Sequence, residues 1–345
     1  MIDKIFAHFG LDEKNIKTEP IGSGLINETW RVRGSNLDLI LQKINHAIFK
    51  NPEAITDNIH HISSYLKEHY PDYLFPKTLP GKNNQELVKL EKDGSYYRMT
   101  HFVKNSHTID TVQNPKQAYE AARQFGRFTH LLSDFPLQKL KVTLPDFHNL
   151  TLRYEQFKEA LYNGDLQRIE DSAELIKFIN SQKNIVSKYE EILKSPDFKV
   201  RVTHHDTKIS NVLFDSDENG LCVIDLDTVM PGYFISDVGD MLRTYLSPVS
   251  EEEKDFSKIE IRDEYFHAIK KGYLEEMQDE LSDEEKKHFI FAGKFMIYMQ
   301  AIRFLTDHLN NDTYYGAKYI GHNFVRAGNQ VVLLKRLLEK EERLS

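Results

Sequence analysis

Cysteine is nearly absent from this chain, which has only Cys222 among its 345 residues. A single cysteine excludes a disulfide framework within the chain and zinc sites built from paired cysteines. Because Leu221 and Val223 flank it, we predict that Cys222 is a small residue of the core.

Long apolar runs are also missing. No stretch approaches the roughly 18 consecutive apolar residues of a membrane span, so we predict no membrane partner. The opening stretch MIDKIFAHFG carries Asp3 and Lys4 and does not resemble a signal peptide. These features predict a cytoplasmic protein.

Positive charge is not in excess either, since the formal net charge is -8. Nucleic-acid binding proteins usually carry a basic face, so we predict no nucleic-acid partner. With 40% hydrophobic and 11% aromatic residues, the chain can bury a full core. Its length predicts two domains or one large bilobal enzyme.

The first hundred residues carry mostly strand patterns. Three short strands are predicted within 17–43, followed by one helix over 51–70 with apolar residues at helical spacing. Two further strands, 85–92 and 95–103, are joined around Asp93-Gly94, a hairpin signal. This order predicts an α+β lobe built on an antiparallel sheet.

The pattern becomes helical after residue 114. Helices are predicted over 114–135, twice within 154–195, and over 236–246, 262–278, 283–309 and 322–341. Short strands interrupt them at 201–225, and the acidic run 250–256 is predicted to be a solvated loop. We therefore predict a small lobe of residues 1–103 and a mostly helical lobe of residues 104–345.

The stretch VTHHDTKISNVLFD places polar residues between two apolar segments. Asp206 lies on a loop, Asn211 follows five residues later, and Asp225 comes directly after a second apolar strand. If 211–214 and 221–224 pair as a hairpin, Asn211 and Asp225 meet at its open end beside Asp206. Carboxylate and amide oxygens suit Mg²⁺, whereas the alternative is a hairpin without chemistry.

Such a set of oxygen ligands suits phosphoryl transfer, in which one aspartate orients the acceptor hydroxyl while an asparagine and a second aspartate hold the metal on the phosphates. The chain has no P-loop motif. The candidate phosphate cradle is the turn that holds Gly22 and Gly24, where backbone N–H groups could approach phosphates. A simple hairpin turn is the alternative.

The neighbouring pair His204 and His205 raises a second hypothesis, a zinc hydrolase. No H-E-x-x-H motif or paired Cys-x₂-Cys accompanies them. We therefore favour the interpretation that His204 braces the loop by hydrogen bonding.

The blocks GSGLINETW, RVTHHDTKISNVLFD, VIDLDTVMPG and DVGDMLR resemble the aminoglycoside phosphotransferase/choline kinase superfamily, which has a protein-kinase-like fold. Within it, the blocks DLDTVMPG and RFLTDHL with the following TYY are most similar to the N-acetylhexosamine 1-kinases. The resemblance runs along the whole chain. It implies an α+β bilobal fold, with a small antiparallel-sheet lobe and a large, mostly helical lobe.

The resemblance also implies ATP and Mg²⁺ as cofactors and a small sugar as the acceptor. Asp206 would be the catalytic base and Lys208 would steady the phosphoryl group, while Asn211 and Asp225 would bind Mg²⁺. The implied nucleotide-binding residues are Gly22, Gly24, Asn27, Lys43, His101 and Val103, with 100–103 as the hinge that contacts adenine. The implied acceptor-binding residues are Asp206, Arg243, Arg303 and Tyr314.

Three positions depart from the family pattern. The lysine expected on the third strand is replaced by Gln42, and Lys43 beside it points to the opposite face of the sheet. The helix that should supply a glutamate offers Asp57 and Asn58 instead. Leu25 stands where the similar sugar kinases have a histidine.

The leading hypothesis is transfer of phosphate from ATP to the anomeric hydroxyl of an N-acetylhexosamine by a monomer. The same chemistry on another sugar, choline, homoserine or an aminoglycoside is the close alternative. A pseudokinase that binds without turnover is the alternative from another class.

Overall fold

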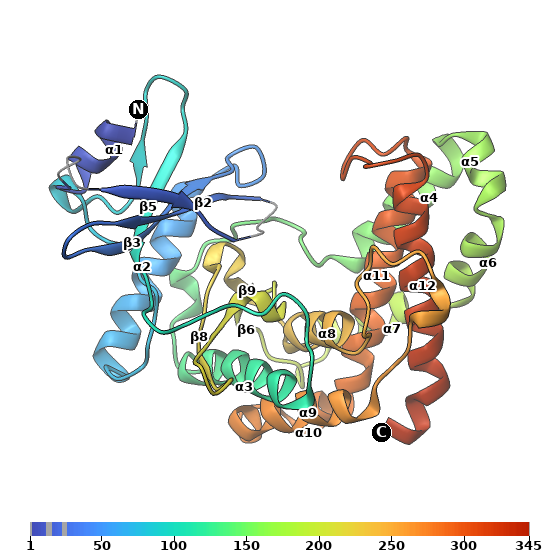
Figure 1. The fold of residues 1–345 in the computed structure, drawn as a ribbon. Coiled ribbons are helices and arrows are strands. Elements are labelled where there is room, and N and C mark those ends of the chain that lie inside the picture. Colours follow the sequence, from blue (N-terminus) through green and yellow to red (C-terminus); the bar gives the residue numbers. More distant parts are fainter. Residues whose placement is uncertain (1, 12–15, 23–25, 345) are drawn as a thin grey trace.

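A computed structural model describes residues 2–11, 16–22 and 26–344. The chain folds into a small lobe built on a sheet and a larger lobe built mainly from helices, and the two chain ends lie in different lobes (Figure 1). The placement of a boundary between residues 103 and 104 stays a prediction.

The small lobe is a five-stranded antiparallel sheet in the order β1-β2-β3-β5-β4. Its strands are β1 (Lys17–Pro20), β2 (Glu28–Arg33), β3 (Asp38–Ile44), β4 (Val88–Lys89) and β5 (Tyr96–His101). Because alternate residues of a strand share a face, Val32, Leu41 and Met99 form a fully buried core on one side. All five predicted strands are confirmed, although β4 is shorter than expected.

A helix that the sequence analysis did not predict covers part of this core. Helix α1 (Ile2–His8) buries Ile5 and Phe6 against the sheet. A helix of seven residues gives too short an apolar pattern to be recognised from sequence alone.

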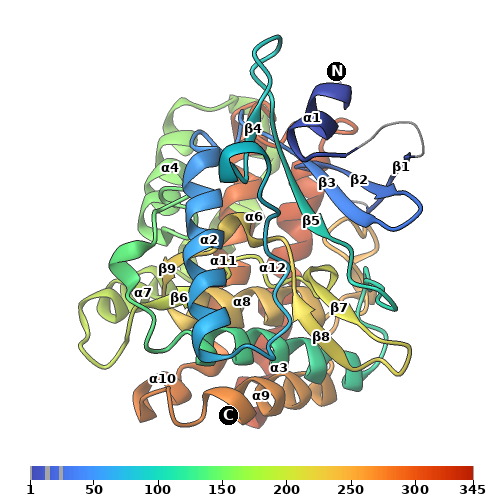
Figure 2. The ribbon, with the colours of Figure 1, turned by 90° about the vertical axis from the view of Figure 1, so that its left-hand side faces the viewer.

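Helix α2 (Pro52–His69) confirms the helix predicted at 51–70. The Asn51 side chain caps it by accepting a hydrogen bond from the Ala54 N–H at 3.0 Å, and Pro52 occupies the first turn. Its buried Ile55 and Ile59 belong to the same apolar cluster as the helices of the large lobe. Helix α2 therefore joins the lobes, and Figure 2 shows it running down the side of the molecule.

The large lobe surrounds one long apolar helix, α11. The other helices are α3 (Pro115–Leu131), α4 (Leu150–Asn163), α5 (Leu166–Asp171), α6 (Ala173–Ser181), α7 (Asn184–Lys194), α8 (Phe234–Tyr245), α9 (Asp263–Met277), α10 (Asp283–Lys287) and α12 (His322–Leu344). Among the described residues, only α11 (Phe289–Leu309) is long and apolar enough to cross a membrane by composition, and 83% of its apolar window is buried inside the fold. It packs against α4, α8 and α12 as a central core helix.

Two helix predictions in this lobe were wrong in number. The segment 154–195 holds parts of four helices rather than two, because the chain turns at Gly164 and again at Ser172 and Gln182. A side chain at Gly164 would place its Cβ 2.4 Å from the Ala160 carbonyl oxygen, so this tight turn requires glycine. The helix predicted at 283–309 is divided at His288 into α10 and α11.

Four short strands lie between the lobes' main bodies. They are β6 (Arg201–Thr203), paired with β9 (Met230–Gly232), and β7 (Val212–Phe214), paired with β8 (Gly220–Val223). The predicted hairpin of residues 211–224 is therefore confirmed. Strand β9 was missed because Pro231 and Gly232 are uncommon in strands. Cys222 is fully buried as predicted, and burial raises the pKa of its thiol to about 12.

Candidate active site

Residues 204–211, which we call the Asp206 loop, bring three predicted residues together. The Asn211 amide nitrogen donates to the Asp206 carbonyl at 2.8 Å and to the Asp206 carboxylate Oδ2 at 3.0 Å. The Lys208 Nζ lies 3.2 Å from the same carboxylate oxygen. The Asp206 side chain keeps 21% of its surface exposed, so the carboxylate is held firmly and still reachable from solvent.

The hairpin of β7 and β8 brings Asp225 to this loop. The Ile224 N–H donates to the Asn211 carbonyl at 2.8 Å, so the residue after it lies beside the Asp206 loop. Asp225 has a left-handed backbone, with φ of 59°, and its side chain is open to solvent on one side. Crowding by protein on the other side, together with the carboxylates of Asp227 and Asp206, raises the pKa of Asp225.

These residues suit a hard divalent cation. Because the Asn211 nitrogen is bound to Asp206, its amide oxygen is the atom that a ligand would meet. Carboxylates outnumber cations at this place, and an added cation would relieve their repulsion. Within the described residues no group of three His, Cys, Asp or Glu side chains could form a cage by itself. One carboxylate and one amide oxygen form the sparse donor set that Mg²⁺ takes alongside phosphates.

Lys208 carries the positive charge nearest to Asp206. Burial alone would lower its pKa, but the carboxylates of Asp206, Asp240 and Asp225 raise it, so the ammonium group stays charged at neutral pH.

Two buried aspartates of α8 support the Asp206 loop from below. The Asp237 carboxylate accepts the N–H groups of His204 at 3.0 Å and His205 at 2.7 Å, and Asp240 accepts the Thr207 N–H at 2.9 Å. Burial raises the pKa of Asp237 to about 7, and the two accepted N–H groups oppose this shift. The sequence analysis assigned no role to these aspartates, although two acids three residues apart on an apolar helix were a usable signal.

His204 is a brace rather than a ligand. Its Nε2 lies 2.9 Å from the Ile224 carbonyl oxygen, and its Nδ1 accepts the Asp206 N–H at 3.4 Å. The side chain is fully buried, and burial lowers its pKa. Because both ring nitrogens are engaged by the backbone, the interpretation of His204 as a brace is confirmed.

The predicted nucleotide-binding residues that the structure describes come from the strands and connecting segments of the small lobe. Gly22 has a positive φ of 82°, as a glycine turn requires, whereas Gly24 and Leu25 lie outside the described residues. His101 ends β5 with its side chain exposed, and the Val103 carbonyl accepts the Ser106 hydroxyl at 2.6 Å.

A buried polar network lies beside these residues and reaches the large lobe. The Asn27 amide donates to the Asp227 carboxylate Oδ2 at 2.7 Å, and the Arg98 Nη1 lies 2.5 Å from the other carboxylate oxygen. Arg98 also donates from its Nε to the Gln42 Oε1 at 3.0 Å. Lys43 forms an ion pair with Glu28 at 2.9 Å, so its ammonium group takes no part in the contact between Gln42 and Arg98.

Helix α2 contacts the large lobe through an asparagine in place of the expected glutamate. The Asn58 side chain is fully buried and donates to the carbonyls of Lys141 at 2.8 Å and Val229 at 3.0 Å, while its oxygen accepts the Lys141 N–H at 2.8 Å. Asp57 pairs with the Lys141 ammonium group at the surface.

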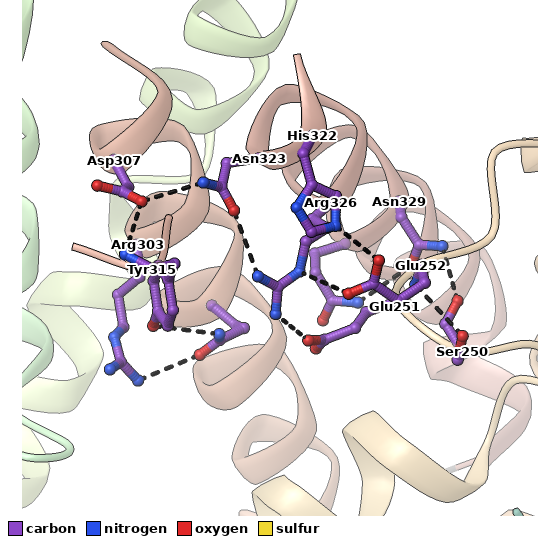
Figure 3. Close-up of polar contacts among 12 residues, drawn as sticks. Ser250, Glu251, Glu252, Arg303, Asp307, Tyr315, His322, Asn323, Arg326 and Asn329 are labelled. Atoms are coloured by element: carbon purple, nitrogen blue, oxygen red, sulfur yellow. Dashed lines mark hydrogen bonds and ion pairs between the residues drawn. The ribbon is translucent and has the colours of Figure 1, made fainter. Parts of the chain in front are cut away.

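The predicted acceptor side lies near α11 and α12, where the acidic run 250–256 is tied down (Figure 3). Glu251 accepts hydrogen bonds from Arg326 and, at 2.8 Å, from Arg243, whose remaining contacts go to Asp240 at 2.9 Å. Glu252 binds the His322 ring at 2.6 Å. The predicted loop is present and its residues Ser250, Lys254 and Asp255 are exposed, but Glu251 and Glu252 are held by side chains of the helices rather than by solvent alone.

Arg303 makes fewer hydrogen bonds than Arg243. Its Nη1 donates to the Gln300 side-chain oxygen at 3.2 Å, and its guanidinium carbon lies 5.4 Å from the ring centre of Tyr315 and 5.8 Å from that of Phe147 (Figure 3). The neighbouring Tyr314 is 70% exposed. The sequence analysis assigned no role to Tyr315, although it lies in the TYY block, or to Phe147, which no motif marks.

This acceptor side connects to the Asp206 loop through aromatic rings. The ring of His148 lies 5.2 Å from that of His205 and stacks on Phe147 at 4.4 Å, and Phe147 in turn contacts Arg303. Burial and the surrounding arginines, including Arg303, lower the pKa of His148, so its ring is neutral.

Three solved structures share the fold over nearly the whole chain. A microcompartment-associated aminopropanol kinase matches with a TM-score of 0.70 and 14% identity, covering 100% of this chain and 99% of that one. A spectinomycin phosphotransferase in complex with ADP and spectinomycin matches with a TM-score of 0.63 and 14% identity, covering 99% of this chain and 97% of that one. A choline kinase from Cryptosporidium parvum matches with a TM-score of 0.58 and 15% identity, covering 99% of this chain and 96% of that one. The predicted α+β, protein-kinase-like bilobal fold is thereby confirmed.

The sequence match is narrower but identifies the family. Residues 17–279 match the phosphotransferase enzyme family, which is well over half of the chain. The superfamily resemblance is confirmed, while the nearer likeness to N-acetylhexosamine 1-kinases stays a prediction. The chain therefore belongs to the phosphotransferase enzyme family.

Proposed function

We propose that this protein transfers the γ-phosphoryl group of ATP, with Mg²⁺, to a hydroxyl group of a small acceptor. The observation that carries the proposal is the convergence of Asp206, Lys208, Asn211 and Asp225 in a member of a phosphotransferase family. A spectinomycin phosphotransferase with ADP and an amicoumacin kinase with AMP-PNP and Ca²⁺ share the fold, which supports a nucleotide as donor.

Asp206 is the group that would orient the acceptor hydroxyl and take its proton. Its carboxylate is fixed by Asn211 and Lys208 yet partly exposed, as a base that meets its substrate must be. The charged Lys208 would stay beside the phosphoryl group and offset its negative charge during transfer.

Asn211 and Asp225 would hold Mg²⁺ through the amide oxygen and the carboxylate. The metal would neutralise charge on the donor phosphates. The backbone at Gly22 and Gly24 would cover those phosphates beside Asn27, and the backbone of His101 and Val103 would meet the adenine. Lys43 is already paired with Glu28, so we assign it no direct phosphate contact.

For the acceptor we propose the anomeric C1 hydroxyl of an N-acetylhexosamine. The contacts of Arg153 and Arg303 support an uncharged acceptor. Arg153 donates to the Gln156 side chain at 3.0 Å and the Asp146 carbonyl at 2.9 Å, and burial together with the Arg303 charge lowers its pKa. Among the described residues, no carboxylate lies within ion-pair distance of either guanidinium.

Such a pair of like charges would repel an ammonium group and would donate hydrogen bonds to neutral sugar oxygens. This charge pattern disfavours choline, aminoglycosides and amino alcohols as acceptors. The exposed Tyr314 and the half-buried Tyr315 would border the sugar beside Arg303. Arg243 would act through its ion pairs with Asp240 and Glu251 rather than on the sugar directly.

The test is a turnover screen with Mg²⁺-ATP against N-acetylglucosamine, N-acetylgalactosamine, neutral hexoses, choline, homoserine and an aminoglycoside. We expect the N-acetylhexosamines to give the highest kcat/KM, with a sugar 1-phosphate identified by its phosphorus–proton coupling in NMR. Turnover of an ammonium acceptor alone would contradict the assigned acceptor but not phosphoryl transfer. Nucleotide binding without turnover of any acceptor would instead favour the pseudokinase alternative.

A further inference from the structure

A buried ion pair connects the two lobes next to the proposed metal site. The Arg98 Nη1 on β5 lies 2.5 Å from the Asp227 Oδ1, and the two side chains expose only 3% and 2% of their surface. Neither of these atoms has a hydrogen-bond partner among the described residues. Each charge therefore depends on the other for its compensation.

The same aspartate also accepts a hydrogen bond from Asn27, which directly precedes β2. The Asn27 amide donates to the Asp227 Oδ2 at 2.7 Å, and the Asn27 oxygen accepts the Asn45 N–H at 2.9 Å. Asp227 lies in the 3₁₀ turn Leu226–Thr228, two residues after Asp225. One carboxylate thus joins Asn27, which directly precedes β2, to the segment that follows the proposed metal ligand.

The strand register explains why an arginine of β5 makes this contact. Gln42 on β3 is directly opposite Arg98, and its oxygen accepts the Arg98 Nε–H at 3.0 Å. The Gln42 nitrogen donates to the Thr29 hydroxyl at 3.3 Å, which ties the arginine to β2 as well. Lys43, the basic residue of β3, points to the opposite face and pairs with Glu28.

A buried ion pair is a weak source of stability, because removing both charges from water offsets most of their attraction. Losing one partner is costly, since the other charge is then buried alone. A pair of this kind that spans two lobes is better explained by the geometry it imposes than by the stability it adds.

We propose that Arg98 is a positioning residue that, through Asp227 and Asn27, holds the start of β2 and the Asp225 segment at the spacing that Mg²⁺-nucleotide requires. The inference rests on the proposed function, because it assumes that the nucleotide lies between these two segments. Arg98 itself touches the protein rather than the substrate.

The test compares Arg98→Met, Asp227→Asn and the double variant by thermal unfolding, by calorimetric binding of Mg²⁺-ADP and by KM for ATP. Each single variant leaves one buried charge without its partner, so we expect a lower Tm and at least about tenfold weaker Mg²⁺-ADP binding. The double variant contains no unpaired charge, and the amide oxygen introduced by Asp227→Asn can still accept from Asn27. We expect its Tm to recover toward wild type while Mg²⁺-ADP binding stays at least about tenfold weaker.

The control is a second buried ion pair within the large lobe, Arg201 with Glu285 at 2.6 Å. Arg201→Met is expected to lower the Tm and to leave Mg²⁺-ADP binding unchanged. Recovery of both Tm and binding in the double variant would overturn the inference, because the pair would then be purely structural. A wild-type protein that binds no Mg²⁺-ADP would overturn the proposed function as well.

Discussion

Two residues at the proposed site have strained backbones. His205 and Asp225 both have positive φ, at 67° and 59°, a conformation that costs non-glycine residues about 1 kcal/mol or more. The Asp237 carboxylate holds the first by accepting its N–H, and the β7–β8 hairpin holds the second. Both residues lie in the segments that bring the Asp206 and Asp225 carboxylates near each other.

The buried His205 predicts a loss of stability in acid. Burial, together with the neighbouring His204 ring, lowers the His205 pKa from 6.5 to about 3, so the folded protein keeps the ring neutral. The unfolded chain takes up the proton near pH 6.5, so this stability is complete above that pH and is lost as the pH falls toward 3. At pH 5 the loss from this residue alone is about 2 kcal/mol.

His205→Asn removes the titration and tolerates the left-handed backbone. Denaturant unfolding at pH 7.5 and pH 5 should show that wild type loses about 2 kcal/mol more than the variant. Equal losses in the two proteins would mean that His205 is protonated in the folded state.

Sequence alone identified residues that lie close together along the chain. Asp206, Lys208 and Asn211 occupy one loop, and Asp225 follows it by a single hairpin, so a local pattern was sufficient. Arg98 could not be found in this way, because its partner Asp227 lies in the other lobe and only strand register brings them together.

At the scale of elements, α2 depends on one asparagine for its position. Asn58 makes three hydrogen bonds to the backbone of Lys141 and Val229, and Val229 follows the turn that holds Asp227. Helix α2 and the segment after Asp225 are thus fixed to each other without a lysine–glutamate pair.

Asn58→Leu should destabilise the protein by about 2–4 kcal/mol, because it leaves buried backbone groups of Lys141 and Val229 without partners. Asn163→Leu, at an exposed position on α4, is the matched control and should change stability by less than about 0.5 kcal/mol. Chemical unfolding measures both. A loss below about 1 kcal/mol for Asn58→Leu would show that water or neighbouring groups replace the amide.

The length of the apolar pattern decided which helices and strands could be predicted from the sequence. Long periodic helices such as α2, α3 and α12 were predicted because an apolar stripe persists over several turns. Strand β9 was missed because of its Pro231 and Gly232, and the number of helices within 154–195 was underestimated because α5 and α6 have six and nine residues and bury at most one of them.

At the scale of the molecule, the lobes contribute different groups to one place. The small lobe supplies the Gly22 turn, Asn27 and Arg98, and the large lobe supplies the Asp206 loop, Asp225 and the arginines near α11. The bilobal division was predictable from the change in sequence pattern. The charge distribution at the acceptor side was not, because it depends on which carboxylates fold back onto which arginines.

Asp206→Asn is the most direct test of the central claim, that Asp206 accepts the proton during phosphoryl transfer. Asparagine keeps the shape and one oxygen but cannot act as a base at neutral pH. The measurement is kcat for ATP-dependent phosphorylation of the best acceptor, with Mg²⁺-ADP affinity and Tm recorded on the same samples.

Asp217→Asn, an exposed position in the β7–β8 turn, is the control and should retain wild-type kcat. We predict that Asp206→Asn lowers kcat by roughly 10²- to 10⁴-fold while Tm and Mg²⁺-ADP affinity stay close to wild type. A variant that retains near-full kcat would contradict the account.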